Sequence, residues 1–447
     1  QDASVYKPRR KSALNTTAQH DQLSRTAAIR KLAKTDRPQA ITQLIAFLQD
    51  TFDLTIENLQ INDDQYSLNS LNGFFEADGA AFFFKFHQEE GEEDMKGEYY
   101  RAEIIADAGL PIDMPFMTST LPGKQILVYK RRNDKRFSDV LLDLDISPDV
   151  KAEARAARAE TVLNKQILEV ALRTLHPVSV SQVREEPVHH LFFDRMLDLK
   201  SGAVPGGRYK DFYVDQIFSF PGVELHWHEF SQAKLVVNGQ SMRSTFGEIF
   251  EVAARNLHPD NLANAGGFTA HGDAHNANVW FEASGAEPTL SYFDPAFAGE
   301  HIPSLLAEAK ATFHNTLAHP LWLYNAEDVA SIFQTEASYK NGILTLHSNW
   351  SLSPIRQKLL DAKIEAFWKP FLAHLFKHDM LPDTWQQTLR SALAMCPALV
   401  MNLRANADRH NPASSAIAFS LIALCGSEPE AGTNLVAEFL HRITPSP

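Results

Sequence analysis

The sequence predicts an α+β protein that has a small, strand-rich front part and a large, mainly helical back part. Between residues 72 and 86, two apolar runs flank Asp78-Gly79, and Asp-Gly readily takes the positive φ angles of a tight hairpin turn. From residue 148 to residue 175 the chain is rich in Ala, Glu, Arg and Leu, which predicts one long helix. Beyond Asp294 we expect mostly helices, separated by Pro and Gly.

The other elements of the front part follow from the same patterns. Apolar residues at helical spacing over 39–52 predict an amphipathic helix before the first strands. Residues 97–108 predict a helix that Gly109 and Pro111 end. Residues 126–129, Ile-Leu-Val-Tyr, predict a further strand.

In the back part, a predicted helix over 244–257 leads into the most informative segment of the chain. Residues 268–281 have an apolar entry, a polar centre and an apolar exit, which predicts a loop held between two short strands. Residues 290–294 predict another strand that ends in a carboxylate.

The composition excludes several classes of protein. With 44% hydrophobic and 22% charged residues, the chain has the composition of an ordinary globular protein. Two cysteines rule out a disulfide scaffold. The longest apolar stretch, residues 416–425, is too short to span a membrane, and no signal peptide opens the chain. We therefore expect a cytoplasmic protein without a membrane partner.

The charge is unevenly distributed along the chain. The formal net charge is −13, with +6 in residues 1–40 and −19 in the remainder. A body this acidic repels a nucleic-acid backbone, so we expect no nucleic-acid partner. It attracts cations, which is compatible with metal ions or a cationic ligand. The oligomeric state is left open.

The polar loop and the strand after it bring one carboxylate, one amide and a second carboxylate together. Phosphoryl transfer uses this set of groups, because the protein mainly contributes positioning and charge neutralisation. One Asp orients the attacking hydroxyl and takes its proton late, while an Asn and a second Asp supply oxygen ligands to Mg²⁺.

The motif His271-Gly-Asp273-x-His275-x-x-Asn278 resembles the catalytic loop of the aminoglycoside phosphotransferase/choline kinase-like family, the small-molecule branch of the protein-kinase-like fold. Residues 294–299, Asp-Pro-Ala-Phe-Ala-Gly, look like the version found in sugar-type kinases of this group, such as fructosamine kinases. The resemblance implies that Asp273 is the catalytic base and that Asn278 and Asp294 are the Mg²⁺ ligands. His271 is expected to be structural.

The resemblance also implies a bilobal fold with a small antiparallel-sheet N-lobe and a large, mainly helical C-lobe. We expect a basic, helical N-terminal extension over residues 1–58 and a nucleotide-binding N-lobe over 59–130. The C-lobe would span 131–447, with an enlarged insertion over about 131–240 and the catalytic loop over 268–300.

The front part can be compared with the same family. Lys85 lies in an apolar strand, where a cation is costly without an anionic partner, and the resemblance implies that it holds the donor phosphates. Glu98 is its implied partner, and Glu103 on the same predicted helix is the alternative. Tyr129 falls where the family has its hinge strand, so it would face the adenine of ATP.

These observations predict an ATP- and Mg²⁺-dependent phosphotransferase that phosphorylates a hydroxyl of a small molecule. The acceptor would be a sugar, an amino sugar, an aminoglycoside or an amino alcohol, and GTP stays open as the donor. The phosphate-covering loop expected near residues 67–73 has one glycine instead of several, so a kinase-like pseudoenzyme with a binding or regulatory role is the alternative.

Two further patterns carry less weight. Residues 272–275 also fit a fragment of a metal-dependent phosphoesterase, but the chain lacks that class's earlier Asp-x-His strand and later His clusters. His226 and His228 alternate like metal ligands on a strand, yet two histidines without a clear third ligand are usually ordinary polar positions rather than a zinc site.

Overall fold

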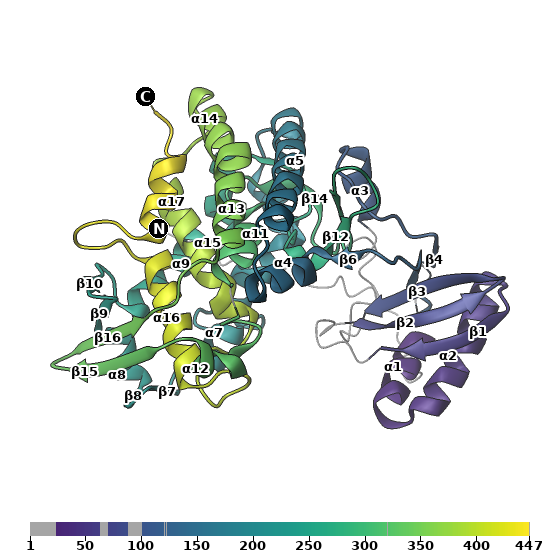
Figure 1. Ribbon diagram of the computed structural model, residues 1–447, viewed down its shortest axis with the longest axis horizontal. Helices are drawn as coiled ribbons and strands as arrows, with labels where there is room; N and C mark the ends of the chain where they lie inside the picture. Colours follow the sequence, from purple (N-terminus) through teal and green to yellow (C-terminus); the bar gives the residue numbers. More distant parts are fainter. Residues whose placement is uncertain are drawn as a thin grey trace. The chain divides into compact units, whose positions relative to one another are not determined.

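The computed structural model describes residues 24–62, 70–87, 101–119, 121, 123–319 and 321–446. Contacts within the chain divide the described residues into two compact units. The smaller unit takes in residues 24–103 and 112–134, and the larger unit takes in residues 104–111 and 135–446. Figure 1 draws both units with their helices and strands labelled.

The smaller unit is built on one antiparallel sheet of five strands in the order β1-β2-β3-β5-β4. The predicted hairpin is confirmed, with its turn at Asp78 and Gly79, whose φ angles are 50° and 76°. The predicted strand over 126–129 is also confirmed. The strands are β1 (Ile56–Ile61), β2 (Ser70–Ala77), β3 (Ala80–His87), β4 (Met117–Ser119) and β5 (Ile126–Lys130).

Two helices, α1 (Arg25–Thr35) and α2 (Arg37–Phe52), pack against one face of this sheet (Figure 1). Side chains alternate along a strand, so β3 directs Phe82 and Phe84 into the core below these helices. The residues between and after them, Phe83 and Lys85, therefore lie on the opposite face. The helix predicted over 39–52 corresponds to α2.

Helices make up most of the larger unit, as the sequence predicts. The predicted long helix is α5 (Val150–Thr174), which packs against α13, and the helix before the polar loop is α9 (Phe246–Asn256). Thr245 caps α9 by accepting a hydrogen bond from the Glu248 amide at 3.3 Å. The remaining α-helices are α3 (Ala102–Asp107, within this unit from Ile104), α4 (Phe137–Ile146), α6 (Val180–Glu185), α7 (Gly207–Tyr213), α8 (Trp227–Gln232), α10 (Pro259–Leu262), α11 (Ala309–Thr312), α12 (Val329–Ile332), α13 (Pro354–Lys363), α14 (Lys369–Lys377), α15 (Trp385–Val400), α16 (Pro412–Gly426) and α17 (Leu435–Ile443).

Short 3₁₀ and π segments join these helices. Two of them are π-helical, η6 (Phe313–Leu317) after α11 and η8 (Ile364–Trp368) after α13. The 3₁₀ segments are η2 (Pro187–Leu191), η3 (Phe193–Met196), η4 (Ala263–Ala265), η5 (Asn276–Asn278) and η7 (Ala326–Asp328).

The larger unit also contains strands. A four-stranded sheet has the order β10-β9-β16-β15, in which β9 and β16 run parallel and the other neighbours run antiparallel. The remaining pairs are β7 with β8, β11 with β14, and β13-β12-β6. The strands are β6 (Lys135–Arg136), β7 (Ile217–Phe220), β8 (Val223–His226), β9 (Lys234–Val237), β10 (Gln240–Ser241), β11 (Gly267–Ala270), β12 (Val279–Glu282), β13 (Thr289–Tyr292), β14 (Gly299–Pro303), β15 (Thr335–Lys340) and β16 (Ile343–Ser348).

The hairpin β15–β16 departs from the expectation of mostly helical structure after Asp294. Its turn is Asn341-Gly342, with φ angles of 51° and 77°. Asn-Gly between two alternating runs is a strong hairpin signal, so this element could have been predicted from the sequence.

The longest apolar stretch of the sequence lies in α16, which is buried on nearly every side, mainly by α15 and the strands β7, β15 and β16. It is therefore a core helix. Across the described ranges, no helix is long and apolar enough to cross a membrane. The predicted fold class, an antiparallel sheet in a small unit and a mainly helical large unit, is confirmed.

Candidate active site

The polar loop of the predicted catalytic motif lies between β11 and β12, as the sequence indicates. β11 pairs with β14, and β12 pairs with β13, so both ends of the loop are fixed by antiparallel strands. Gly272 has a φ of 76° in this loop. A Cβ atom there would lie well inside the van der Waals contact distance of the Phe297 carbonyl oxygen, so the position requires glycine.

His271 holds the backbone of the loop. Its Nε2–H donates to the Phe293 carbonyl at 3.0 Å, and its Nδ1 accepts from the Asp273 amide at 3.3 Å. Burial lowers the pKa of His271, which favours the neutral ring that this pattern needs. His271 therefore has the contacts expected of a structural histidine.

Asn278 joins the loop to the strand that leads to Asp294. Its side-chain Nδ2 donates to the Asp273 carbonyl at 2.9 Å, and its own carbonyl accepts from the Phe293 amide at 3.0 Å. Since Phe293 directly precedes Asp294, the backbone brings both predicted metal ligands to adjacent strand ends. The nitrogen of the Asn278 amide is engaged, which leaves its Oδ1 as the atom suited to a metal.

The donor set of Asn278 and Asp294 fits Mg²⁺, because one amide oxygen and one carboxylate leave coordination sites for phosphate oxygens and water. Within the part of the chain that the structure describes, no group of three or more His, Cys, Asp or Glu is arranged to hold a metal ion. His226 and His228 do not share a strand as the sequence suggested, because β8 ends at His226 and His228 lies in α8.

The carboxylate of Asp273 is nearly buried and is paired with Lys310. The Lys310 Nζ lies 2.6 Å from Asp273 Oδ1, and the two side chains are 9% and 10% exposed. The His275 Nε2 lies 3.6 Å from the same oxygen. Burial alone raises the pKa of Asp273, but the nearby Lys310 ammonium is the main opposing influence, and the pKa lies below its usual value. Asp273 is therefore ionised at neutral pH.

His275 carries no charge at neutral pH, because burial lowers its pKa to about 4. Its ring lies 5.8 Å from that of His314 between centroids, and burial lowers the pKa of His314 well below the usual value. The positive charge beside Asp273 is thus supplied by Lys310 and not by these histidines.

Sequence reasoning did not identify Lys310. It lies in α11, in a run of buried residues that includes two charged ones, Glu308 and Lys310. Charged residues in an otherwise apolar helical stretch indicate buried partners, and this was the available signal.

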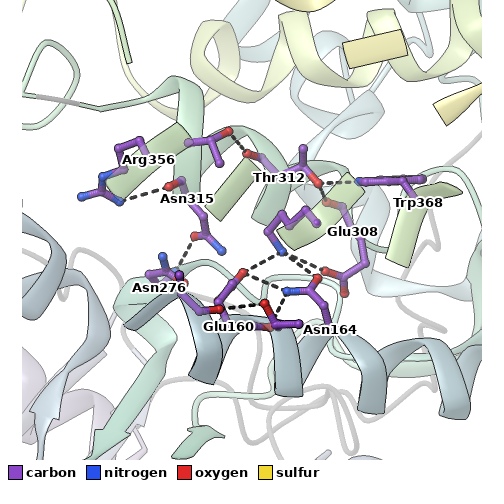
Figure 2. A network of polar contacts seen from close by, with 12 residues as sticks. Glu160, Asn164, Asn276, Glu308, Thr312, Asn315, Arg356 and Trp368 are labelled. Atoms are coloured by element: carbon purple, nitrogen blue, oxygen red, sulfur yellow. Dashed lines mark hydrogen bonds and ion pairs between the residues drawn. The ribbon is translucent and has the colours of Figure 1, made fainter. Parts of the chain in front are cut away.

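Figure 2 shows a network of polar contacts that meets the loop at Asn276. The Asn276 amide donates to Asn315 Oδ1 at 2.7 Å, and Arg356 Nη1 donates to the Asn315 carbonyl at 3.1 Å (Figure 2). Arg356 is fully buried, and its Nη2 lies 2.7 Å from Asp145 Oδ2. The buried ion pair thus anchors Arg356, and Arg356 in turn holds Asn315, whose side chain accepts the Asn276 amide of the loop.

The second part of this network lies about two helical turns further along α13, at Lys363. Lys363 Nζ lies 3.3 Å from Glu160 Oε1 and 3.7 Å from Glu308 Oε2. Asn164 donates through Nδ2 to Glu160 Oε1 at 3.1 Å (Figure 2). One lysine therefore faces two buried carboxylates, Glu160 from α5 and Glu308 just before α11, and its single charge can balance only one of them. In keeping with this, burial raises the pKa of Glu308 to about 7.

In the smaller unit, Lys85 and Tyr129 lie on the same face of the sheet. β3 and β5 are neighbours, with Phe83 opposite Tyr129 and Lys85 opposite Leu127. Phe83, Leu127 and Tyr129 form an apolar cluster on the face away from α1 and α2. The structure thus brings these two predicted nucleotide contacts together. Glu98 lies outside the described residues, and Glu103 is exposed in α3.

No protein-family model and no curated protein matches the sequence. Three solved structures to which the chain is similar are small-molecule phosphotransferases. Spectinomycin phosphotransferase has a TM-score of 0.37 at 11% identity, over 86% of this chain and 97% of that one. Ethanolamine kinase from Plasmodium vivax has a TM-score of 0.40 at 9% identity, over 91% of this chain and 95% of that one. A microcompartment-associated aminopropanol kinase has a TM-score of 0.43 at 12% identity, over 86% of this chain and 96% of that one.

Proposed function

We propose that this protein is a small-molecule kinase of the aminoglycoside phosphotransferase/choline kinase-like family, which transfers the γ-phosphoryl group of ATP to a hydroxyl of a small molecule. The observation that carries this proposal is the loop geometry. Asp273 has an ionised, nearly buried carboxylate, and its backbone carbonyl accepts a hydrogen bond from the Asn278 side chain. The Asn278 carbonyl in turn accepts from the amide of Phe293, the residue before Asp294.

In the proposed reaction, Asp273 accepts a hydrogen bond from the acceptor hydroxyl and orients it toward the γ-phosphorus. A bond forms between the acceptor oxygen and phosphorus, the bond from phosphorus to the bridging oxygen of ADP breaks, and the hydroxyl proton passes to Asp273. Because the pKa of Asp273 is lowered, the carboxylate is a weak base, and proton transfer comes late.

Asn278 and Asp294 would hold Mg²⁺ through one amide and one carboxylate oxygen. When bound, the ion supplies charge neutralisation for the phosphate oxygens of the nucleotide. The fixed amide orientation of Asn278 supports this role, because its Nδ2 is engaged with the Asp273 carbonyl at 2.9 Å.

For the nucleotide, we propose that Lys85 contacts the donor phosphates and that Tyr129 contacts the base. Their shared face of the sheet, with an apolar cluster beside a cation, has the chemistry that an adenine ring and its phosphates need. Glu98 or Glu103 would pair with Lys85, and residues 131–240 would shape the acceptor pocket. ATP is the proposed donor, with GTP as the comparison.

The acceptor class that we propose is a sugar, amino sugar, aminoglycoside or amino alcohol. The formal net charge of −13 is compatible with a cationic acceptor. A cytoplasmic location fits these metabolites and the nucleotide donor.

The test is Mg²⁺-dependent ADP release with a panel of these acceptors, for the wild-type protein and for Asp273→Ala. We expect one acceptor class to raise ADP release, and Asp273→Ala to lower kcat about 10²–10⁴-fold, since the base is lost. Nucleotide binding, measured as a thermal shift with and without Mg²⁺, should be retained by the variant.

Two outcomes contradict the proposal. If no acceptor raises ADP release while the protein binds nucleotide, the kinase-like pseudoenzyme is the better account. If Mg²⁺ binds but nucleotide gives no thermal shift, the metal-dependent phosphoesterase class is favoured instead.

A further inference from the structure

The ion pair between Lys310 and Asp273 is a feature that the catalytic motif does not contain. Both side chains are nearly buried, and Nζ and Oδ1 lie 2.6 Å apart. A buried ion pair is weak evidence for stability, because the cost of removing two charges from water offsets much of their attraction. The position of this pair, on the proposed base, therefore calls for a functional account.

Lys310 belongs to a segment that contacts the catalytic loop at two points. It lies in α11, and the chain continues directly into the π-helix η6. From η6, Asn315 Oδ1 accepts the Asn276 amide at 2.7 Å. One helical segment thus holds the loop through the Asp273 side chain and through the Asn276 backbone. π-Helical turns of this kind are rare and occur frequently at functional sites.

This segment is itself fixed on several sides. Trp368 Nε1 donates to Thr312 Oγ1 at 2.8 Å, and Arg356 Nη1 donates to the Asn315 carbonyl at 3.1 Å. Glu308, two residues before Lys310, lies 3.7 Å from Lys363 Nζ. Figure 2 shows Thr312, Asn315 and Glu308 with these partners. The backbone that carries Lys310 is therefore preorganised, and its ammonium can define the position of a partner.

The contacts of the Asp273 carboxylate are asymmetric. Within the described ranges, Lys310 and His275 both approach Oδ1, at 2.6 Å and 3.6 Å. An ion pair at Oδ1 restricts rotation of the carboxylate about the Cβ–Cγ bond, and so restricts the direction of the second oxygen. That second oxygen, Oδ2, is the atom that can accept a hydrogen bond from a hydroxyl.

We propose that Lys310 is a positioning residue for phosphoryl transfer, whose ammonium fixes Oδ1 of Asp273 so that Oδ2 meets the acceptor hydroxyl. This inference rests on the proposed function. Lys310 itself makes and breaks no covalent bond. His275 Nε2 lies farther from the same oxygen, at 3.6 Å, than the Lys310 ammonium does at 2.6 Å.

The kinetic test compares Lys310→Met, which keeps the length and removes the charge, with Lys310→Arg. We expect Lys310→Met to lower kcat about 10²-fold, because a misplaced reacting group costs about this much, and to leave the KM for ATP unchanged. Lys310→Arg should recover part of kcat. In the Asp273→Asn background, Lys310→Met should cause no further loss, since Lys310 acts through that carboxylate.

Lys358→Met is the matched control, because Lys358 pairs with Glu153 in the same unit and is 40% exposed. It should keep the kcat of the wild-type protein. A Lys310→Met variant that also keeps wild-type kcat, or one that lowers kcat equally in the Asp273→Asn background, would overturn the inference while the proposed function stands.

A second measurement does not depend on activity. The melting temperatures of the wild type, Lys310→Met, Asp273→Asn and the double variant form a double-mutant cycle. We expect the double variant to melt at a higher temperature than the sum of the two single shifts predicts. The reason is that each single variant leaves one buried charge unpaired, whereas the double variant leaves none. Additive shifts in melting temperature would show that the ion pair does not contribute, and would overturn it.

If the wild-type protein releases no ADP with any acceptor, the proposed function is wrong and the positioning role fails with it, whatever the cycle shows. If Lys310→Met does not fold, Lys310→Arg and the double variant provide the same comparisons.

Discussion

The residues of the polar loop between β11 and β12 differ in what fixes them. Gly272 is fixed by backbone conformation, with a φ of 76° and the Phe297 carbonyl oxygen where a Cβ would stand. His271 is fixed by two hydrogen bonds to the backbone, and Asp273 by an ion pair. Three different interactions therefore hold three consecutive residues, and each can be removed separately.

Gly272→Ala tests the backbone requirement. We expect it to destabilise the protein by more than the ~1–3 kcal/mol that a strained backbone alone costs, because a Cβ also clashes with the Phe297 carbonyl oxygen. ADP release should fall with it, since the loop must shift. Urea unfolding and the ADP assay measure the two effects.

Gly342→Ala is the matched control for this prediction. Gly342 has a φ of 77°, nearly that of Gly272, but a Cβ there meets no atom within 4 Å. It should lose stability by the backbone cost alone, about 1 kcal/mol, and keep its rate of ADP release. Equal losses from the two substitutions would show that the contact with Phe297 has no effect.

At the scale of elements, the sequence predicts the strands and helices that have a clear period and misses what depends on tertiary contact. α5, α9, β5 and the hairpin β2–β3 follow from hydrophobic periodicity and turn residues. The motif points to Asp273, Asn278 and Asp294 because these residues are close in sequence. Lys310 reaches Asp273, and Arg356 reaches Asn315, only through the folded helices, so no local pattern identifies their partners.

The helical segment before η6 contains a carboxyl group that should titrate near neutral pH. Burial raises the pKa of Glu308 to about 7, against the lowering effect of Lys363. The folded state therefore binds a proton more tightly than the unfolded state. Protonated Glu308 therefore stabilises the folded state. This contribution to the free energy of unfolding is complete at pH values below the usual pKa of a glutamate, and it is lost as the pH rises toward 7.

Glu308→Gln should remove this dependence. From pH 5 to pH 7, the wild-type protein should lose on the order of 2 kcal/mol relative to the variant, as judged from chemical unfolding at each pH. Glu365→Gln is the control, because Glu365 is 55% exposed and pairs with Arg442 and Lys369 at the surface. If the difference in the free energy of unfolding between the wild type and Glu308→Gln stays constant from pH 5 to pH 7, the pKa of Glu308 is not raised.

At the scale of the whole molecule, the chain divides into two compact units, and the cores that hold them are separate. In the described part of the smaller unit, α1, α2 and the sheet enclose a core in which Phe84 is 0% exposed. In the larger unit, Phe419 of α16 is also fully buried and lies against a group of aromatic rings, with Phe230 at 5.0 Å between centroids. The residues with proposed nucleotide contacts lie in one unit and the catalytic loop lies in the other.

Separate cores predict that the two units unfold in distinguishable steps, because each has its own cooperative packing. Phe84→Ala and Phe419→Ala each delete one buried ring, which costs about 3–5 kcal/mol locally. In differential scanning calorimetry, Phe84→Ala should lower the melting temperature of the transition that belongs to the smaller unit. Phe419→Ala should lower the melting temperature of the transition that belongs to the larger unit. Mg²⁺ alone should raise only the transition that Phe419→Ala lowers, because Asn278 and Asp294 belong to that unit. A single transition that both substitutions shift equally would mean that the units fold as one.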